Sequence, residues 1–213
     1  MTSGAWALLA VAGVFAVFNW VAAARDSKRL EYVSKPATMV ALVGVALALD
    51  PVHPDTRAWF VAALMLSLLG DVFLMLPRES FVAGLASFLI AHVAYTVGLN
   101  LHAGTATALV VASVVVVLVG VTVAVPILRG LRSGGQQELA GPVVAYMVVI
   151  TAMLVSALAT GNPWAAGGAA LFYASDAMIA WTRFVRPQPG SGVAIMVTYH
   201  LGQAGLVLSL AFT

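Results

Sequence analysis

Long apolar stretches alternate along this chain with short segments that contain charged residues, proline or glycine. A helix needs about 20 mostly apolar residues to cross the hydrocarbon core of a bilayer. By this criterion the pattern predicts eight transmembrane helices, at residues 4–24, 33–49, 57–76, 80–100, 105–128, 138–159, 163–184 and 190–212. The sequence therefore predicts an all-α fold, a polytopic membrane bundle of eight transmembrane helices.

Composition supports this interpretation and excludes several classes of protein. Of the 213 residues, 62% are hydrophobic and 8% are charged, whereas a soluble domain has about 25% charged residues. The connections are short, so we expect a single transmembrane domain over residues 1–213, with its longest flexible connection at residues 129–137. The chain has no cysteine, which excludes disulfides, thiol catalysis and cysteine-ligated metals. No basic face for nucleic acid is visible.

Lysine and arginine are divided unevenly between the two sets of loops. Arg57 is alone on one side, and the other side has Arg25, Lys28, Arg29, Lys35, Arg78, Arg129, Arg132, Arg183 and Arg186. The positive-inside rule assigns the richer side to the cytoplasm, so we expect both termini outside it. The first apolar run lacks the positive leader of a cleaved signal peptide, and we expect it to be retained. Abundant Ala, Val, Gly and Arg indicate a GC-rich bacterium, and hence a bacterial inner (plasma) membrane.

Two acidic residues lie inside otherwise apolar helices. These are Asp71, in the segment LLGDVFLML, and Asp176, in the segment FYASDAMIAWTRF. A charged side chain at the centre of a membrane helix costs about 2.5–3.5 kcal/mol on insertion scales, so it usually faces a cavity or a polar partner. Each Asp can also be a packing contact, hydrogen-bonded to a neighbouring helix. Both fall in the predicted cytoplasmic half of the bilayer, which favours one shared functional site.

Further polar side chains are predicted at a similar depth. They are Asn19 on the first helix, His92 and Tyr95 on the fourth, Tyr173 on the seventh, and Tyr199, His200 and Gln203 on the eighth. Residues three or four apart share a helix face, so Tyr173 faces the same way as Asp176. Each of these side chains can be explained by packing alone. Together with the two acids they predict one pocket toward the cytoplasmic side.

Lys35 and Pro36 are expected to open the second helix at the cytoplasmic surface. An ammonium group beside a helix N-terminus binds a lipid phosphate well. Simple snorkelling of the lysine toward the membrane surface explains the same position almost equally well.

The two halves of the chain also show a faint internal similarity. Asp71 and Asp176 occupy the third helix of each four-helix half, and an aromatic residue recurs with a histidine in each fourth helix, in HVAY (92–95) and TYH (198–200). This pattern indicates two parallel four-helix repeats, related by an axis along the membrane normal.

In these residues the chain resembles the lysoplasmalogenase family, also called YhhN-like. The similar motifs, in order, are Lys35-Pro36, Gly70-Asp71, Phe81, Phe88, His92, Tyr95, Tyr173, Ser175-Asp176, Arg183-Phe184, Tyr199 and Gln203. Each motif is short, but their order and spacing extend over nearly the whole chain. The match at His200 is the weakest.

The resemblance implies hydrolysis of the vinyl ether bond of a lysoplasmalogen, to a fatty aldehyde and glycerophosphoethanolamine or glycerophosphocholine. This chemistry needs an acid that protonates the outer alkenyl carbon and a carboxylate that stabilises the resulting oxocarbenium ion, as in glycoside hydrolases. Asp71 and Asp176 are expected to divide these catalytic roles. His92, Tyr95, Tyr173, Tyr199, Gln203 and Asn19 would bind the substrate, and Lys35 would bind its phosphate. No cofactor or metal is expected.

Two alternatives remain open at this point. Paired intramembrane acids and histidines also suit a proton-coupled transporter of small solutes, although the polar residues here gather toward one face. A zinc-dependent intramembrane lipid hydrolase would use His92, Asp71, Asp176 and His200 as ligands, but the sequence has no HExxH motif. The expected partners are the lysophospholipid substrate and the membrane lipids. The pattern does not indicate an oligomeric state.

Overall fold

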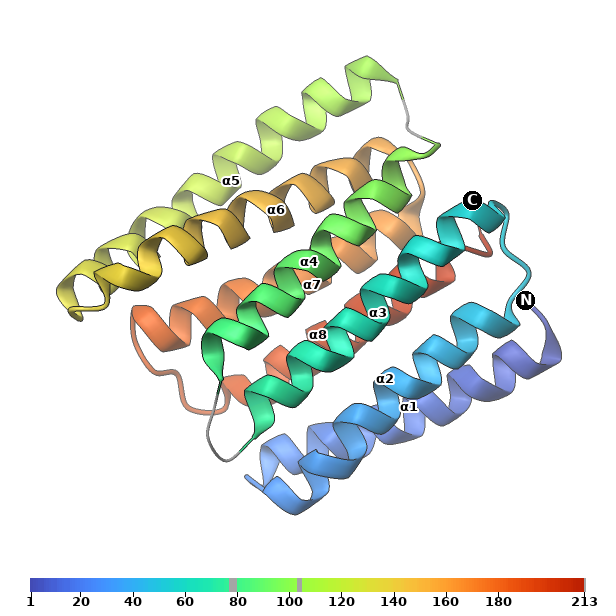
Figure 1. Ribbon diagram of the computed structural model, residues 1–213, viewed down its shortest axis with the longest axis horizontal. Coiled ribbons are helices and arrows are strands. Elements are labelled where there is room, and N and C mark those ends of the chain that lie inside the picture. Colours follow the sequence, from blue (N-terminus) through green and yellow to red (C-terminus); the bar gives the residue numbers. More distant parts are fainter. Residues whose placement is uncertain (77–79, 103–104, 213) are drawn as a thin grey trace.

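The structure, a computed structural model, describes residues 1–76, 80–102 and 105–212, and within them it is helical without strands (Figure 1). The helices are α1 (Ser3–Ala24), α2 (Lys28–Ala48), α3 (Pro54–Met75), α4 (Phe81–Asn100), α5 (Ala106–Ser133), the short 3-10 helix η1 (Gln137–Leu139), α6 (Ala140–Ala159), α7 (Pro163–Phe184) and α8 (Ser191–Leu208). The prediction of an all-α bundle with eight long helices is confirmed.

Most of the long helices meet the criteria for a membrane span. Within the described ranges seven of them are long and apolar enough, and α7, which carries Asp176 and Arg183, is the exception. On α5, the side chains of Val110, Val114 and Leu118 are 57–66% exposed. Such a broad apolar surface is unfavourable in water and is expected where lipid covers it. The protein is an integral membrane protein.

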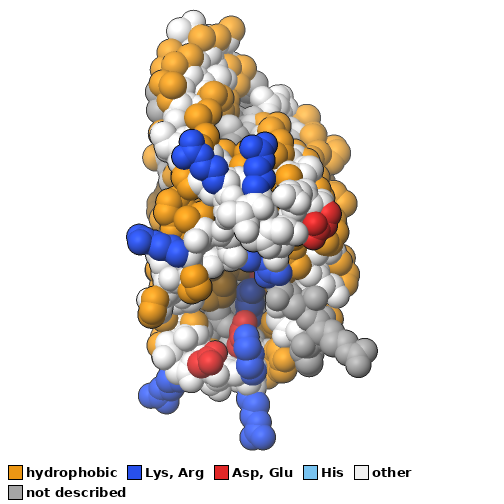
Figure 2. Space-filling model, turned by 90° about the vertical axis from the view of Figure 1, so that its left-hand side faces the viewer, with side chains coloured by type: hydrophobic (Ala, Val, Ile, Leu, Met, Phe, Trp, Pro, Cys, Tyr) orange, Lys and Arg blue, Asp and Glu red, His pale blue; other side chains and the backbone are white. Residues whose placement is uncertain are grey.

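Successive helices pack as antiparallel pairs, α1 with α2, α3 with α4, α5 with α6 and α7 with α8. Further contacts of α4 with α6 and of α1 with α8 join the pairs into one bundle. The α1–α2, α5–α6 and α7–α8 connections lie at one end, and both chain termini lie at the other (Figure 1). Lys and Arg side chains gather at the end that holds these three connections (Figure 2). Arg78, which was counted with them, lies outside the described residues.

Two predicted helix ends are wrong. Helix α2 begins at Lys28, so Lys35 and Pro36 lie about two turns inside it and do not form its N-terminus. The first turn is stabilised there by Glu31, whose carboxylate accepts from Lys28 at 2.8 Å. Helix α5 continues through Pro126 to Ser133, so most of the connection expected at 129–137 is helical.

The pair α7–α8 is packed unusually closely through glycines. A Cβ atom built on Gly168 would lie 2.6 Å from the backbone nitrogen of Leu206, and one on Gly202 would lie 2.8 Å from that of Phe172. Small residues allow membrane helices to approach until their backbones touch. This contact fixes the position of α8, with Tyr199 and Gln203, against α7.

Candidate active site

A cavity that opens to the surface lies among α3, α4, α5, α6 and α7, and its empty space, counted with the open mouth, is about 740 Å³. Its walls are mostly aliphatic and aromatic side chains, including Phe88, Ile127 and Phe184. Among the described residues Asp176 is the one carboxyl group in this lining, and Tyr146 and Tyr173 add two hydroxyl groups. The cavity therefore combines apolar walls with an acid, which is the arrangement of a site for a lipid-like ligand.

Two side chains contact Asp176. The hydroxyl group of Tyr146 donates a hydrogen bond to Oδ2, and Nε2 of His92 lies 3.7 Å from the same oxygen. Nδ1 of His92 lies 2.6 Å from the carbonyl oxygen of Phe88. A carbonyl group only accepts, so Nδ1 carries a proton, and in the neutral ring Nε2 holds a lone pair. That lone pair is buried beside Asp176 and has no hydrogen-bond partner among the described residues.

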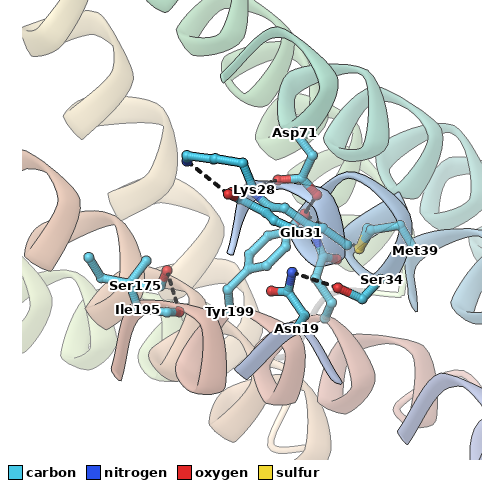
Figure 3. A network of polar contacts seen from close by, with 11 residues as sticks. Asn19, Lys28, Glu31, Ser34, Met39, Asp71, Ser175, Ile195 and Tyr199 are labelled. Carbon is cyan, nitrogen blue, oxygen red and sulfur yellow. Dashed lines mark hydrogen bonds and ion pairs between the residues drawn. The ribbon is translucent and has the colours of Figure 1, made fainter. Parts of the chain in front are cut away.

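Asp71 lies in a separate, buried polar network. Its Oδ1 forms an ion pair of 2.9 Å with Nζ of Lys35, and its Oδ2 accepts a hydrogen bond of 2.7 Å from the hydroxyl group of Tyr199. Figure 3 shows Asp71 and Tyr199 pointing toward one another. The network continues to Gln203, whose Oε1 accepts a 2.6 Å hydrogen bond from the hydroxyl group of Tyr95. Asp71 is 1% exposed and is absent from the cavity lining.

Asn19 and His200 connect α1 with its neighbours. Nδ2 of Asn19 donates to Oγ of Ser34 on α2 at 3.2 Å, a contact drawn in Figure 3. Nε1 of Trp20 donates to Nδ1 of His200 on α8 at 3.2 Å. Both Asn19 and His200 are buried, and neither lines the large cavity.

Aromatic rings separate the Asp71 network from the Asp176 cavity. The ring of Phe88 contacts both Phe172, at 6.2 Å between centroids, and Tyr199, at 6.0 Å. The ring of Phe172 lies 4.7 Å from that of His92. The predicted site residues are thus brought into two adjacent clusters that share one aromatic wall. They do not line a single open pocket.

Tyr146 is a site residue that sequence reasoning missed. It lies on α6, in the segment AGPVVAYMVVI, which otherwise has the pattern of a lipid-facing helix. The only signal was one hydroxyl group in the middle of an apolar helix, and nothing in the sequence pairs it with Asp176.

Arg183 brings positive charge near the cavity. Its guanidinium group lies 3.8 Å from the centroid of the Phe81 ring, a cation–π contact. Phe81 and the neighbouring Phe184 both line the cavity. Arg183 lies in the last turn of α7, and this end of α7 is at the end of the bundle opposite the chain termini (Figure 1).

The zinc alternative requires at least three ligand atoms close together. In the part of the chain that the structure describes, the only such group of His, Asp or Glu side chains is His53, Asp55 and His102. His92, Asp71, Asp176 and His200 do not form one. The geometry of the intramembrane residues therefore does not support zinc hydrolysis.

Comparison with known proteins gives one family match and several relatives. The YhhN family model matches residues 30–210. A protein of Mycobacterium bovis named lysoplasmalogenase is 34% identical over 170 residues, which are 76% of this chain and 64% of that protein. Human lysoplasmalogenase TMEM86B is 33% identical over 150 residues, 69% of this chain and 61% of its own length. Human lysoplasmalogenase TMEM86A is 33% identical over 166 residues, 74% of this chain and 66% of its own length.

The chain thus spans less than two thirds of the length of the first of these relatives, 64% for the mycobacterial protein. No solved structure matches the chain.

Proposed function

The chain belongs to the YhhN family, and from this premise we propose that it hydrolyses the vinyl ether bond of a lysoplasmalogen inside the membrane. The products would be a fatty aldehyde and a glycerophospho-alcohol. The observation that carries the proposal is the apolar cavity with Asp176 in its lining, the one carboxyl group there among the described residues. The names of the relatives support the same substrate class.

The cavity suits the alkenyl chain. Sites for small molecules have mostly apolar walls with a few polar groups. The aliphatic and aromatic side chains would surround the hydrocarbon, and Asp176, Tyr146 and Tyr173 would face its polar end.

Asp176 is the proposed general acid. As the uncharged acid it would carry a proton on its carboxyl group, with the lone pair of His92 Nε2 3.7 Å away, beyond hydrogen-bond distance. It would then transfer that proton to the outer alkenyl carbon, and the carbon attached to oxygen would become an oxocarbenium ion. The resulting Asp176 carboxylate would stabilise this cation, and the hydrogen bond from Tyr146 would stabilise the carboxylate.

Water would complete the reaction. It would add to the oxocarbenium carbon and return one proton to the Asp176 carboxylate, directly or through His92, which restores the acid. The hemiacetal formed in this way would break its bond to the glycerol oxygen. Its hydroxyl proton would move to that oxygen, which releases the aldehyde and the glycerophospho-alcohol. Tyr173 would orient the glycerol oxygens.

Asp71 has a positioning role in this proposal. Its charge is compensated by Lys35 at 2.9 Å, and it holds the hydroxyl group of Tyr199 at 2.7 Å. The Tyr199 ring packs against Phe88, which lines the cavity and whose carbonyl oxygen fixes His92. Through these contacts the Asp71 network would support the wall on which His92 and Asp176 depend. Tyr95, Gln203 and Asn19 would extend this support.

Arg183 is the proposed contact for the substrate phosphate. Lys35, which the sequence assigned to the phosphate, forms an ion pair with Asp71. The Arg183 guanidinium lies over Phe81 at the wall of the cavity. A guanidinium group binds phosphate oxygens in a bidentate manner. In the proposed orientation the Lys- and Arg-rich end faces the cytoplasm of a bacterial inner membrane. The head group would lie at that surface, and both termini would lie on the opposite side.

An assay with matched lipids tests this function. The purified full chain in detergent would receive a lysoplasmalogen, the corresponding saturated 1-alkyl ether, or the corresponding 1-acyl lysolipid. We expect aldehyde to be released from the vinyl ether lipid alone, because only that bond yields an oxocarbenium ion on protonation. Absence of aldehyde from the vinyl ether lipid would refute the proposal.

A further inference from the structure

We propose that His53, Asp55 and His102 form a binding site for a divalent metal ion, best suited to zinc, at the end of the bundle that carries the chain termini. The three side chains offer two imidazole nitrogens and one carboxylate oxygen, and these ligand atoms all lie within 4.8 Å of one another. Two histidines with one carboxylate are a common protein ligand set for zinc. Water would supply the fourth ligand.

The backbone brings these residues together from two distant parts of the sequence. His53 is the N-cap residue of α3 and Asp55 lies in its first turn, while His102 lies just beyond the end of α4. Helices α3 and α4 are antiparallel neighbours (Figure 1), so these ends are adjacent. The segment before His53 is held to the end of α8 by a 2.8 Å hydrogen bond from the backbone nitrogen of Val52 to the carbonyl oxygen of Leu210.

The three side chains contact one another directly, through a histidine–carboxylate pair and a stacked pair of imidazole rings. Nε2 of His102 lies 3.0 Å from each carboxylate oxygen of Asp55. The ring of His53 stacks on that of His102, with 3.7 Å between centroids and 15° between planes. Zinc binds nitrogen and oxygen ligands at about 2.0–2.2 Å. A bound ion would replace the His102–Asp55 contact and separate the stacked rings, and because all three residues are exposed, their side chains have room to rotate.

A second cavity supports the assignment of a ligand site here. It has an empty volume of about 580 Å³, and both His53 and His102 line it. Thr56, Asn162 and Ser209 add polar groups to its wall, which suit the water molecules that a metal ion would retain. None of its lining residues lines the cavity of Asp176. The metal site is therefore independent of the proposed hydrolysis.

Zinc titration of the purified full chain tests this site, after removal of any affinity tag. We expect saturable binding of one zinc ion per chain, together with a higher melting temperature in zinc. The variants His102→Gln and Asp55→Asn should each weaken binding by roughly tenfold or more. The matched control Asp50→Asn changes an exposed carboxylate nearby that is outside the cluster and should bind zinc as the unchanged chain does.

The outcomes separate this proposal from the proposed function. Aldehyde release by the His53→Gln/His102→Gln double variant should equal that of the unchanged chain. If the chain proves to have no hydrolytic activity, the test of the metal site still stands, because it measures zinc binding and melting temperature. If the unchanged chain shows no saturable zinc binding and no thermal shift, the metal site is refuted. Equal zinc affinity in the double variant and the unchanged chain would refute it as well. Melting without zinc shows whether each variant is folded.

Discussion

Nε2 of His92 lies 3.7 Å from Oδ2 of Asp176, and the opposite nitrogen of the same ring is fixed by the carbonyl oxygen of Phe88 at 2.6 Å. One wall of the cavity thus directs a lone pair at the carboxyl group of Asp176. In the proposed mechanism a proton stays on Asp176 until a substrate carbon takes it. The proposed acid catalysis depends on this arrangement, which none of the predicted helix positions alone would reveal.

Tyr146→Phe should slow catalysis without unfolding the protein. It removes only the hydroxyl group that donates to Asp176, so the carboxylate formed after proton transfer loses one hydrogen bond. Loss of one such donor typically lowers kcat by about 10²–10³-fold. Steady-state aldehyde release should show a lower kcat with little change in KM. Tyr32→Phe, at an exposed tyrosine, is the control, and an equal effect of both variants would contradict the role of Tyr146.

Lys35→Met should destabilise the protein strongly. It leaves the Asp71 carboxylate buried without its ion-pair partner, and breaking a buried pair in this way costs about 3–5 kcal/mol. Lys28→Met is the matched control, because it breaks a pair in which the lysine side chain is 63% exposed, and exposed pairs contribute at most about 1 kcal/mol. Thermal unfolding in detergent compares the two variants. If Lys35→Met and Lys28→Met melt at the same temperature, the Lys35–Asp71 ion pair does not stabilise the protein more than the exposed pair does.

Gly168→Ala should loosen the α7–α8 pair. The added methyl group would lie 2.6 Å from a backbone atom of α8, which cannot move aside as a side chain would. Overpacking of this kind costs about 1–3 kcal/mol. Gly167→Ala is the control, because a Cβ atom at that position meets nothing within 4 Å. Thermal unfolding should show a lower melting temperature for Gly168→Ala alone. A Gly168→Ala protein that melts at the temperature of the unchanged chain would contradict the close approach of α7 and α8.

Arg183→Gln should weaken substrate binding through the head group. We expect a KM raised by roughly tenfold for a lysoplasmalogen, in line with the energy of about 1.5–3 kcal/mol for a hydrogen bond to a charged group. A 1-alkenylglycerol without phosphate should show the same KM with both proteins. If the variant raises KM for both substrates equally, Arg183 supports the cavity wall and does not bind phosphate.

The sequence predicted the helices well because apolar length and periodicity are local properties. It failed where a boundary depends on packing. Pro36 was expected to start a helix, yet α2 begins at Lys28 and carries Lys35 inward to Asp71. Likewise α5 continues past its expected end because Ile127 and Leu131 are buried against neighbouring helices.

The same distinction, between local properties of the sequence and features that depend on packing, holds for the site residues. Asp71 and Asp176 were recognisable because a carboxyl group in an apolar helix is unusual. Their assignment to separate clusters depends on which helix faces which, and no spacing along the chain contains that information. Tyr146 and the His53–Asp55–His102 group were missed for this reason, since each is defined by contacts between distant helices.

The central claim, that Asp176 is the general acid, is tested most directly by aldehyde release from a lysoplasmalogen by Asp176→Asn and by the unchanged chain. Both proteins would be purified in detergent and shown to melt cooperatively. An amide cannot supply the proton, and the contribution of a general acid is about 10²–10⁴-fold. We predict that kcat falls by a factor in this range. An Asp176→Asn protein that retains the full rate would contradict the account.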